Sequence, residues 1–198
     1  MQEKPDIAAL VGSRICHDLI SPIGAIGNGV ELFLMESALQ SPEFALITES
    51  VNHASARIRF FRIAFGATTA DHSMASREVS SILQGMAVGS RVCIGWTGPE
   101  SLSRRDVKLA FLLILCLETA LPYGGQIEVA RGATRWTLRA TAPRLNMDAA
   151  LWECLITPTS MIEFNAAQVQ FLLVPEEIER QHRRLIIELL TQEIRLSF

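Results

Sequence analysis

Residues 13–32, SRICHDLISPIGAIGNGVEL, lie within a longer run whose apolar residues recur in steps of three and four. This spacing predicts an amphipathic helix. We expect the helix to begin after Asp6, a capping residue type that follows Pro5, and to end near residue 38. Its apolar stripe is formed by Ile7, Val11, Ile15, Leu19, Ile23, Ile26, Val30 and Phe33.

A polar face follows the other side of this predicted helix. It carries Arg14, His17, Ser21, Gly24, Asn28 and Glu31. We therefore expect His17 to point to solvent in mid-helix. Asp18 could accept a hydrogen bond from one ring nitrogen, which leaves the other nitrogen as a nucleophile near neutral pH. A histidine nucleophile forms a labile phosphoramidate and suits a phosphoryl carrier; a solvated surface histidine is the alternative.

Pro22 and several glycines disfavour the same helix. A proline in a helix interior costs ~3 kcal/mol, and a glycine such as Gly24 or Gly27 costs up to about 1 kcal/mol relative to alanine. We expect Pro22 to bend the helix just past His17. The glycines would leave a smooth face for another backbone, either a sister subunit or a docking partner.

A second helix is predicted after Ser41-Pro42, with proline at its first position. Its apolar residues alternate in steps of three and four, which is a heptad pattern. They are Phe44, Ile47, Val51, Ala54, Ile58, Phe61 and Phe65. The short connection predicts an antiparallel hairpin. Because a lone hairpin leaves apolar surface uncovered, we expect two copies to form a four-helix bundle, and hence a homodimer.

The second half of the chain changes character. A buried helix is predicted at residues 103–121, and strand patterns occur at residues 91–96, 126–130, 134–141, 184–189 and 193–198. Residues 166–174 fit either a strand or a helix. We therefore predict an α+β protein with two domains, a helical hairpin at residues 1–70 and an α/β sandwich at residues 71–198.

Composition excludes several functions for this chain of 198 residues. A net charge of −3 gives no basic face for nucleic acid. No apolar run reaches the ~18–20 residues of a membrane span, and the N-terminus lacks a signal-peptide pattern. The four cysteines are far apart in sequence and form no CxxC, and we expect buried, reduced thiols. We expect a cytoplasmic protein that binds neither nucleic acid nor membranes.

The segment His17-Asp18-Leu19-Ile20-Ser21-Pro22 resembles the phospho-acceptor box of sensor histidine kinases, H-(D/E)-x-x-(S/T/N)-P. The longer string at residues 13–32, together with RIAFGA at residues 62–67, is similar to the ChpT-type histidine phosphotransferases of alphaproteobacteria. This resemblance implies a dimer with a kinase-like helical hairpin, followed by a degenerate histidine-kinase ATPase-like domain.

The resemblance also implies roles for individual residues. His17 would be phosphorylated, Asp18 would assist proton movement, and Ser21 would place water or the incoming aspartyl phosphate. The partners would be response-regulator receiver domains, and these would supply the Mg²⁺, so that this chain binds no cofactor. Candidate partner-binding residues are Arg14, Gly24, Gly27, Asn28 and Glu31, with Arg59 and Arg62 expected beside His17 on the second helix.

Residues 112–129 resemble the segment that begins the nucleotide site of histidine kinases, where asparagines hold Mg²⁺ and phosphate. Ile114 and Glu118 stand near those positions; isoleucine cannot ligate, and a glutamate would repel a triphosphate. No glycine occurs after residue 138, although kinases have glycine-rich boxes there. We therefore expect a phosphorelay carrier without ATP-dependent autophosphorylation. An autophosphorylating kinase core and a non-catalytic receiver-binding scaffold are the alternatives.

Overall fold

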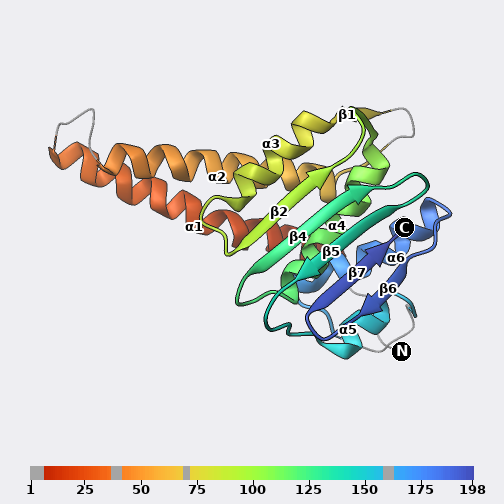
Figure 1. Cartoon of the computed structure of the whole chain (residues 1–198). Helices are drawn as coiled ribbons and strands as arrows, with labels where there is room; N and C mark the ends of the chain where they lie inside the picture. The colour runs from red at the N-terminus through yellow and green to blue at the C-terminus, as the bar shows by residue number, and fades with distance from the viewer. Residues whose placement is uncertain (1–6, 37–41, 69–71, 158–162) are drawn as a thin grey trace.

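The structure, a computed structural model, describes residues 7–36, 42–68, 72–157 and 163–198. Two long helices come first, α1 (Ile7–Glu36) and α2 (Pro42–Ala64). They lie side by side, run in opposite directions and project from the rest of the molecule (Figure 1). Over the described residues both coincide with the helices that the periodicity predicted, whereas the expected cap Asp6 and the expected end near residue 38 lie outside those residues. Helix α1 continues through Pro22, whose side chain is buried.

A five-stranded mixed sheet forms the centre of the second half. Its strand order is β2-β4-β5-β7-β6, with β2 parallel to β4 and all other neighbours antiparallel. The strands are β2 (Val92–Thr97), β4 (Gly125–Arg131), β5 (Trp136–Thr141), β6 (Ile186–Leu189) and β7 (Glu193–Ser197). Two short strands, β1 (Ser73–Ala75) and β3 (Ser101–Ser103), pair separately. Three residues are too few to show a strand pattern in sequence.

Helices cover one face of this sheet (Figure 1). The helical elements of this half are α3 (Ser76–Ala87), α4 (Arg104–Thr119), α5 (Ala149–Cys154), the 3₁₀ turn η1 (Ala166–Gln168) and α6 (Val169–Arg180). The segment at residues 166–174, which fitted a strand or a helix, is therefore helical. The α+β class predicted from sequence is confirmed. Of the cysteines expected to be buried, Cys116 and Cys154 are buried, whereas Cys16 and Cys93 are exposed.

Helix α4 is the centre of the core. Every residue from Val107 to Leu117 is buried, because the helix lies between the sheet, α2 and α6. Along β4 and β5 buried side chains alternate with more exposed ones. On the face away from α4, Glu128 and Arg139 form an ion pair of 2.8 Å. One sheet face is therefore apolar and covered, and the other is charged and open to solvent.

Aromatic packing fixes α2 against this core. The ring of Phe60 stacks on that of Phe111 in α4, with centroids 4.3 Å apart and planes 5° apart. Both side chains are fully buried. Helix α3 also approaches α2 closely, since a Cβ added at Gly85 would lie 2.6 Å from the Cβ of Ala56. These contacts hold the long helices in a defined orientation relative to the sheet.

We predict that Phe60→Ala lowers the free energy of unfolding by about 3–5 kcal/mol, because it removes a buried ring and leaves a cavity beside Phe111. Urea denaturation followed by circular dichroism would measure the loss. Tyr123→Ala is the matched control, since Tyr123 is 64% exposed, and its effect should stay within about 1 kcal/mol. Equal losses in the two variants would contradict this account of the core.

Candidate functional site

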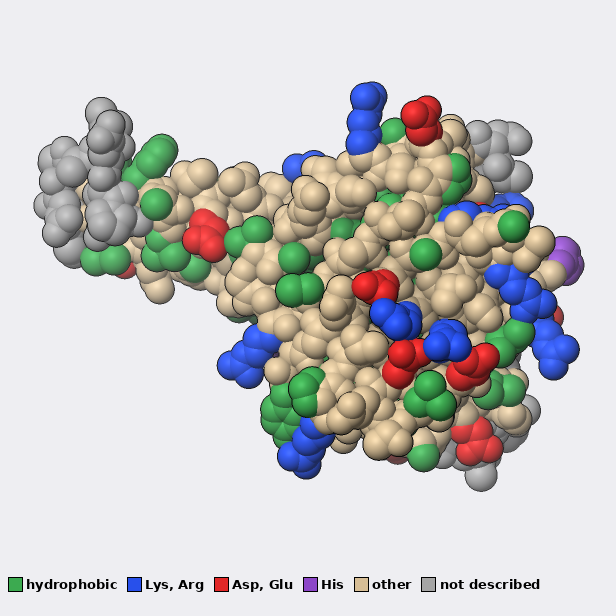
Figure 2. Space-filling model, in the orientation of Figure 1, with side chains coloured by type: hydrophobic (Ala, Val, Ile, Leu, Met, Phe, Trp, Pro, Cys, Tyr) green, Lys and Arg blue, Asp and Glu red, His purple; other side chains and the backbone are tan. Residues whose placement is uncertain are grey.

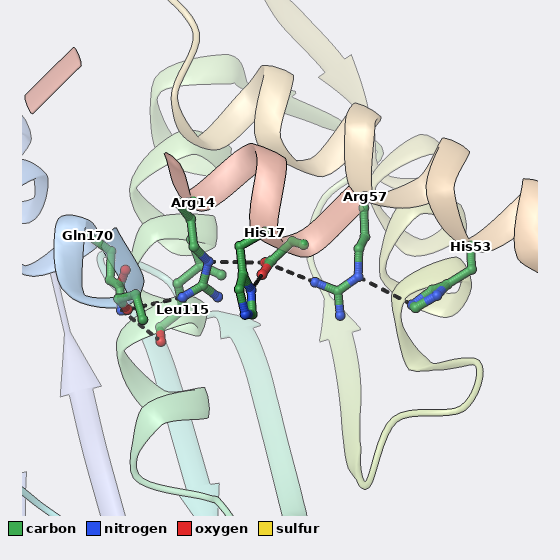
Figure 3. Close-up of polar contacts among 8 residues, drawn as sticks. Arg14, His17, His53, Arg57, Leu115 and Gln170 are labelled. Carbon is green, nitrogen blue, oxygen red and sulfur yellow. Dashed lines mark hydrogen bonds and ion pairs between the residues drawn. The ribbon is translucent and has the colours of Figure 1, made fainter. Parts of the chain in front are cut away.

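His17 lies in the part of α1 that packs against the second half of the chain (Figure 3). Its side chain is 85% exposed, as the helical phase predicted. Ser21, one turn further along α1, is also exposed. The ring of His17 is therefore open to a partner molecule, with a hydroxyl one turn away on the same side of the helix.

The neighbouring Asp18 points inward, and three side-chain nitrogens lie within hydrogen-bond distance of its carboxylate. Its Oδ1 lies 3.1 Å from Nδ1 of His17. Its Oδ2 accepts from Nε of Arg14 and from Nη1 of Arg57, each at 3.0 Å. The carboxylate side chain is only 9% exposed. Two guanidinium groups thus compensate its loss of water, and the predicted contact between Asp18 and the His17 ring is confirmed.

Arg14 does not reach into solvent, which corrects the expectation that it lies on the open polar face. Its side chain is 16% exposed. Its Nη1 donates to the carbonyl of Ala167 in η1 at 3.0 Å, while its Nε holds Asp18 (Figure 3). Arg14 therefore links α1 to the second half of the chain, because a guanidinium can donate in two directions at once.

Arg57 is a site residue that the sequence analysis missed. It extends from α2, and besides Asp18 it contacts His53, whose Nε2 accepts from Arg57 Nε at 3.4 Å. Burial, followed by the nearby Arg57 guanidinium, lowers the pKa of His53, and Glu49 opposes this shift. A neutral His53 ring can accept this hydrogen bond, whereas a protonated ring could not.

Arg59 and Arg62, which were expected beside His17, are both exposed. Within the described ranges, the polar contacts of Asp18 on α2 come from Arg57 rather than from Arg59 or Arg62. The backbone carbonyl of Arg62 accepts from Arg104 at the start of α4. Helical phase, and not distance along the helix alone, decides that Arg57 is the arginine facing Asp18.

Glu118 brings the end of α4 into the same cluster. Burial raises the pKa of Glu118, Arg57 and Arg14 act to lower it, and Asp18 acts to raise it. The position that resembled a nucleotide ligand therefore interacts with the carboxylate and guanidinium groups behind His17. Ile114, at the other such position, is fully buried in the core.

Gly24, Gly27, Asn28 and Glu31 continue along α1 beyond His17, and all are exposed. A Cβ added at Gly24 or Gly27 would meet nothing within 4 Å. The glycine surface is therefore open in the single chain. In the described part of the chain, no group of three or more histidine, cysteine, aspartate or glutamate side chains could hold a metal ion. The helices of these same ranges are too short or too polar to cross a membrane.

Fold and site together define an α+β protein with an exposed histidine on a long helix that is fixed by charged contacts to the sheet-containing half. The family model described as "Histidine phosphotransferase C-terminal domain" matches residues 76–192. This match covers more than half of the chain, which therefore belongs to the histidine phosphotransferase family. The ChpT-type resemblance identified in sequence is confirmed.

Two relatives support the assignment. The chain is 39% identical over 126 residues to the protein phosphotransferase ChpT of Brucella abortus (strain 2308). That alignment covers 63% of this chain and 60% of the Brucella protein, so less than two thirds of the relative is matched. A bacterial phosphotransferase solved at 1.7 Å superimposes with a TM-score of 0.79 and 29% identity, covering 100% of this chain and 97% of that one.

We predict that Glu118→Gln makes the protein more stable than the wild type at about pH 7 but not at about pH 4. The raised pKa of Glu118 means that folding makes ionisation of this carboxyl less favourable than it is in the unfolded chain. The wild type therefore loses stability as pH rises from the unfolded pKa through the folded one. Urea denaturation across this range would measure the difference. Glu100→Gln, at an exposed position, is the control; a similar pH-dependent gain there would contradict the prediction.

Proposed function

We propose that this protein is a phosphorelay intermediate that passes a phosphoryl group between receiver-domain aspartates through His17, without autophosphorylation by ATP. The observation that supports this most directly is the 85% exposed imidazole whose Nδ1 is held by Asp18. Membership of the histidine phosphotransferase family and the named activity of the Brucella relative are consistent with it. The hairpin at residues 1–70 carries the acceptor, and the domain at residues 71–198 supports it.

In this mechanism Nε2 of His17 attacks the phosphorus of an aspartyl phosphate on a docked receiver. Asp18 holds the Nδ1 proton and stabilises the positive charge that the ring acquires. Ser21 helps to place water or the incoming phosphate. Any Mg²⁺ belongs to the receiver, and the work of this chain is positioning and charge stabilisation.

The receiver docks on the open surface around His17. Gly24, Asn28 and Glu31 form its α1 side, with Gly27 allowing close backbone approach. Arg59 and Arg62 on α2 are exposed and able to meet receiver carboxylates. Arg14 acts indirectly in this docking surface, by holding Asp18 next to His17.

Two side chains of α4 support the proposal that this protein does not phosphorylate itself with ATP. Ile114 is fully buried and apolar, so it cannot hold Mg²⁺ or phosphate. Glu118 lies near the guanidiniums of Arg14 and Arg57, and a carboxylate repels a triphosphate. Neither position offers the amide ligands that the kinase resemblance would require.

We predict that incubation with a phosphorylated receiver transfers label to the wild type, and that His17→Ala abolishes the transfer. The label should be acid-labile and base-stable, as a phosphoramidate is. Gel autoradiography after acid and base treatment would measure it. His182→Ala is the matched control, since His182 is exposed at the end of α6, far along the chain from the acceptor, and it should transfer normally.

The same assay separates the alternatives. Labelling of the isolated wild type by radioactive ATP would overturn the proposal in favour of a kinase core. A receiver that binds the wild type but gives no label, with His17→Ala binding equally well, would favour a scaffold.

We further propose that two copies pair through α1 and α2 as a four-helix bundle. Two residues of the heptad pattern of α2, Ala54 and Phe61, are buried within the chain. Three others, Phe44, Val51 and Ile58, are 44–53% exposed. Ile20, Ile23 and Val30 of α1 are 42–68% exposed, and Figure 2 shows hydrophobic side chains along the projecting helices. Apolar surface of this kind is typical of an interface between subunits.

We predict that Ile58→Asp weakens dimerisation by about 10- to 100-fold, because each buried isoleucine contributes about 1.5–3 kcal/mol. Sedimentation velocity over a range of concentrations would measure the dissociation constant. Leu190→Asp, at a 53% exposed position between β6 and β7, is the control and should leave the dimer intact. A wild type that sediments as a monomer at high concentration would contradict the pairing.

A further inference from the structure

The carboxylate of Asp18 is held by two arginines that are themselves anchored elsewhere. Arg14 donates to the Ala167 carbonyl at 3.0 Å and Arg57 donates to His53 at 3.4 Å. Both guanidiniums also donate to the same atom, Oδ2 of Asp18. The carboxylate is therefore fixed from opposite sides, by α1 itself and by α2 (Figure 3).

This arrangement decides which oxygen faces the histidine. With Oδ2 occupied by two cationic donors, Oδ1 remains for Nδ1 of His17 at 3.1 Å. An ionised carboxylate accepts hydrogen bonds and donates none. A neutral imidazole facing it is thus held in the tautomer with its proton on Nδ1, and Nε2 keeps its lone pair.

Of the two arginines that donate to Asp18, Arg57 is the one that does not belong to α1. Arg14 lies four residues before Asp18 on the same helix and moves with it, whereas Arg57 comes from α2. Helix α2 is in turn fixed to the core by the stack of Phe60 on Phe111. Contact with Arg57 therefore fixes Asp18 relative to α2, just as the contact of Arg14 with Ala167 links α1 to η1.

We propose that Arg57 is a positioning residue for phosphoryl transfer, which acts through Asp18 to hold the neutral His17 ring in the tautomer whose Nε2 lone pair is available for attack. The inference rests on the proposed function and adds a residue to it. It also assigns α2 a part in the acceptor site beyond any role in pairing.

The transfer step balances with this tautomer. The Nε2 lone pair forms the N–P bond, and the P–O bond to the receiver aspartate breaks, with its electron pair leaving on that carboxylate. No proton has to leave Nε2, because the ring proton is on Nδ1. The ring becomes cationic, and Asp18 stabilises that charge. Transfer to the second receiver reverses these changes.

The test compares Arg57→Ala, Arg57→Lys and wild type in two measurements. The first is the rate of label transfer from a phosphorylated receiver at increasing receiver concentration. We expect Arg57→Ala to lower the saturating rate by about ten- to a hundredfold, the range for losing a hydrogen bond to a charged group, with little change in the half-saturating concentration. Lysine should restore most of the rate, because Asp18 receives a single N–H from Arg57.

The second measurement is ¹⁵N NMR of the His17 ring in the unphosphorylated protein, assigned by comparison with His17→Ala. In the wild type, Nδ1 should carry the proton. In Arg57→Ala, the ¹⁵N chemical shifts of the two ring nitrogens should move toward those of a solvated imidazole, which populates both tautomers. Arg77→Ala, at an exposed position on α3, is the matched control and should change neither measurement.

A double-mutant cycle separates positioning from a general structural effect. If Arg57 acts through Asp18, adding Arg57→Ala to Asp18→Asn should cost little beyond Asp18→Asn alone, whereas independent damage would add. Additive losses, or a normal His17 tautomer in a folded Arg57→Ala, would overturn the inference. A wild type that accepts no label would instead refute the proposed function, and the NMR result would still decide the role of Arg57.

Discussion

The organisation of the site depends on one carboxylate that is almost removed from water. Asp18 is 9% exposed, and an unpaired carboxylate at that depth would carry a large desolvation penalty. Arg14 and Arg57 remove that penalty, and to do so α1, α2 and η1 must all be in place. Because consecutive residues of a helix point about 100° apart, an inward Asp18 places His17 outward. The exposure of His17 is therefore a consequence of burying Asp18 beside it.

This constraint gives the sheet-containing half of the chain a supporting role in the site we propose. Its η1 turn supplies the Ala167 carbonyl to Arg14, and Glu118 at the end of α4 interacts electrostatically with the two guanidiniums. The rest of α4 packs in the core, where every residue from Val107 to Leu117 is buried. The helix thus serves packing and local charge balance.

Much of this could be predicted from the sequence, and the failures have a common cause. Helices α1 and α2, the strand pairs and the exposed His17 follow from periodicity, because each depends on neighbours close in the chain. In an antiparallel pair of helices, residues equally far from the connection lie opposite each other. With a connection centred near residue 39, Asp18 is expected opposite about residue 60. Arg57, Arg59 and Arg62 were therefore all within reach, and only the exact phase of one helix against the other favours Arg57.

The sequence by itself determined the α+β class and the polar face that presents His17, since local spacing encodes these, and its resemblance to known phosphotransferases indicated the family. The tertiary structure decided that Arg14 turns inward to Ala167, that Arg57 meets Asp18, and that Glu118 lies near both arginines. These contacts join residues from 39 to 153 positions apart. They arise only when packing brings distant segments together, and no local pattern in the chain carries that information.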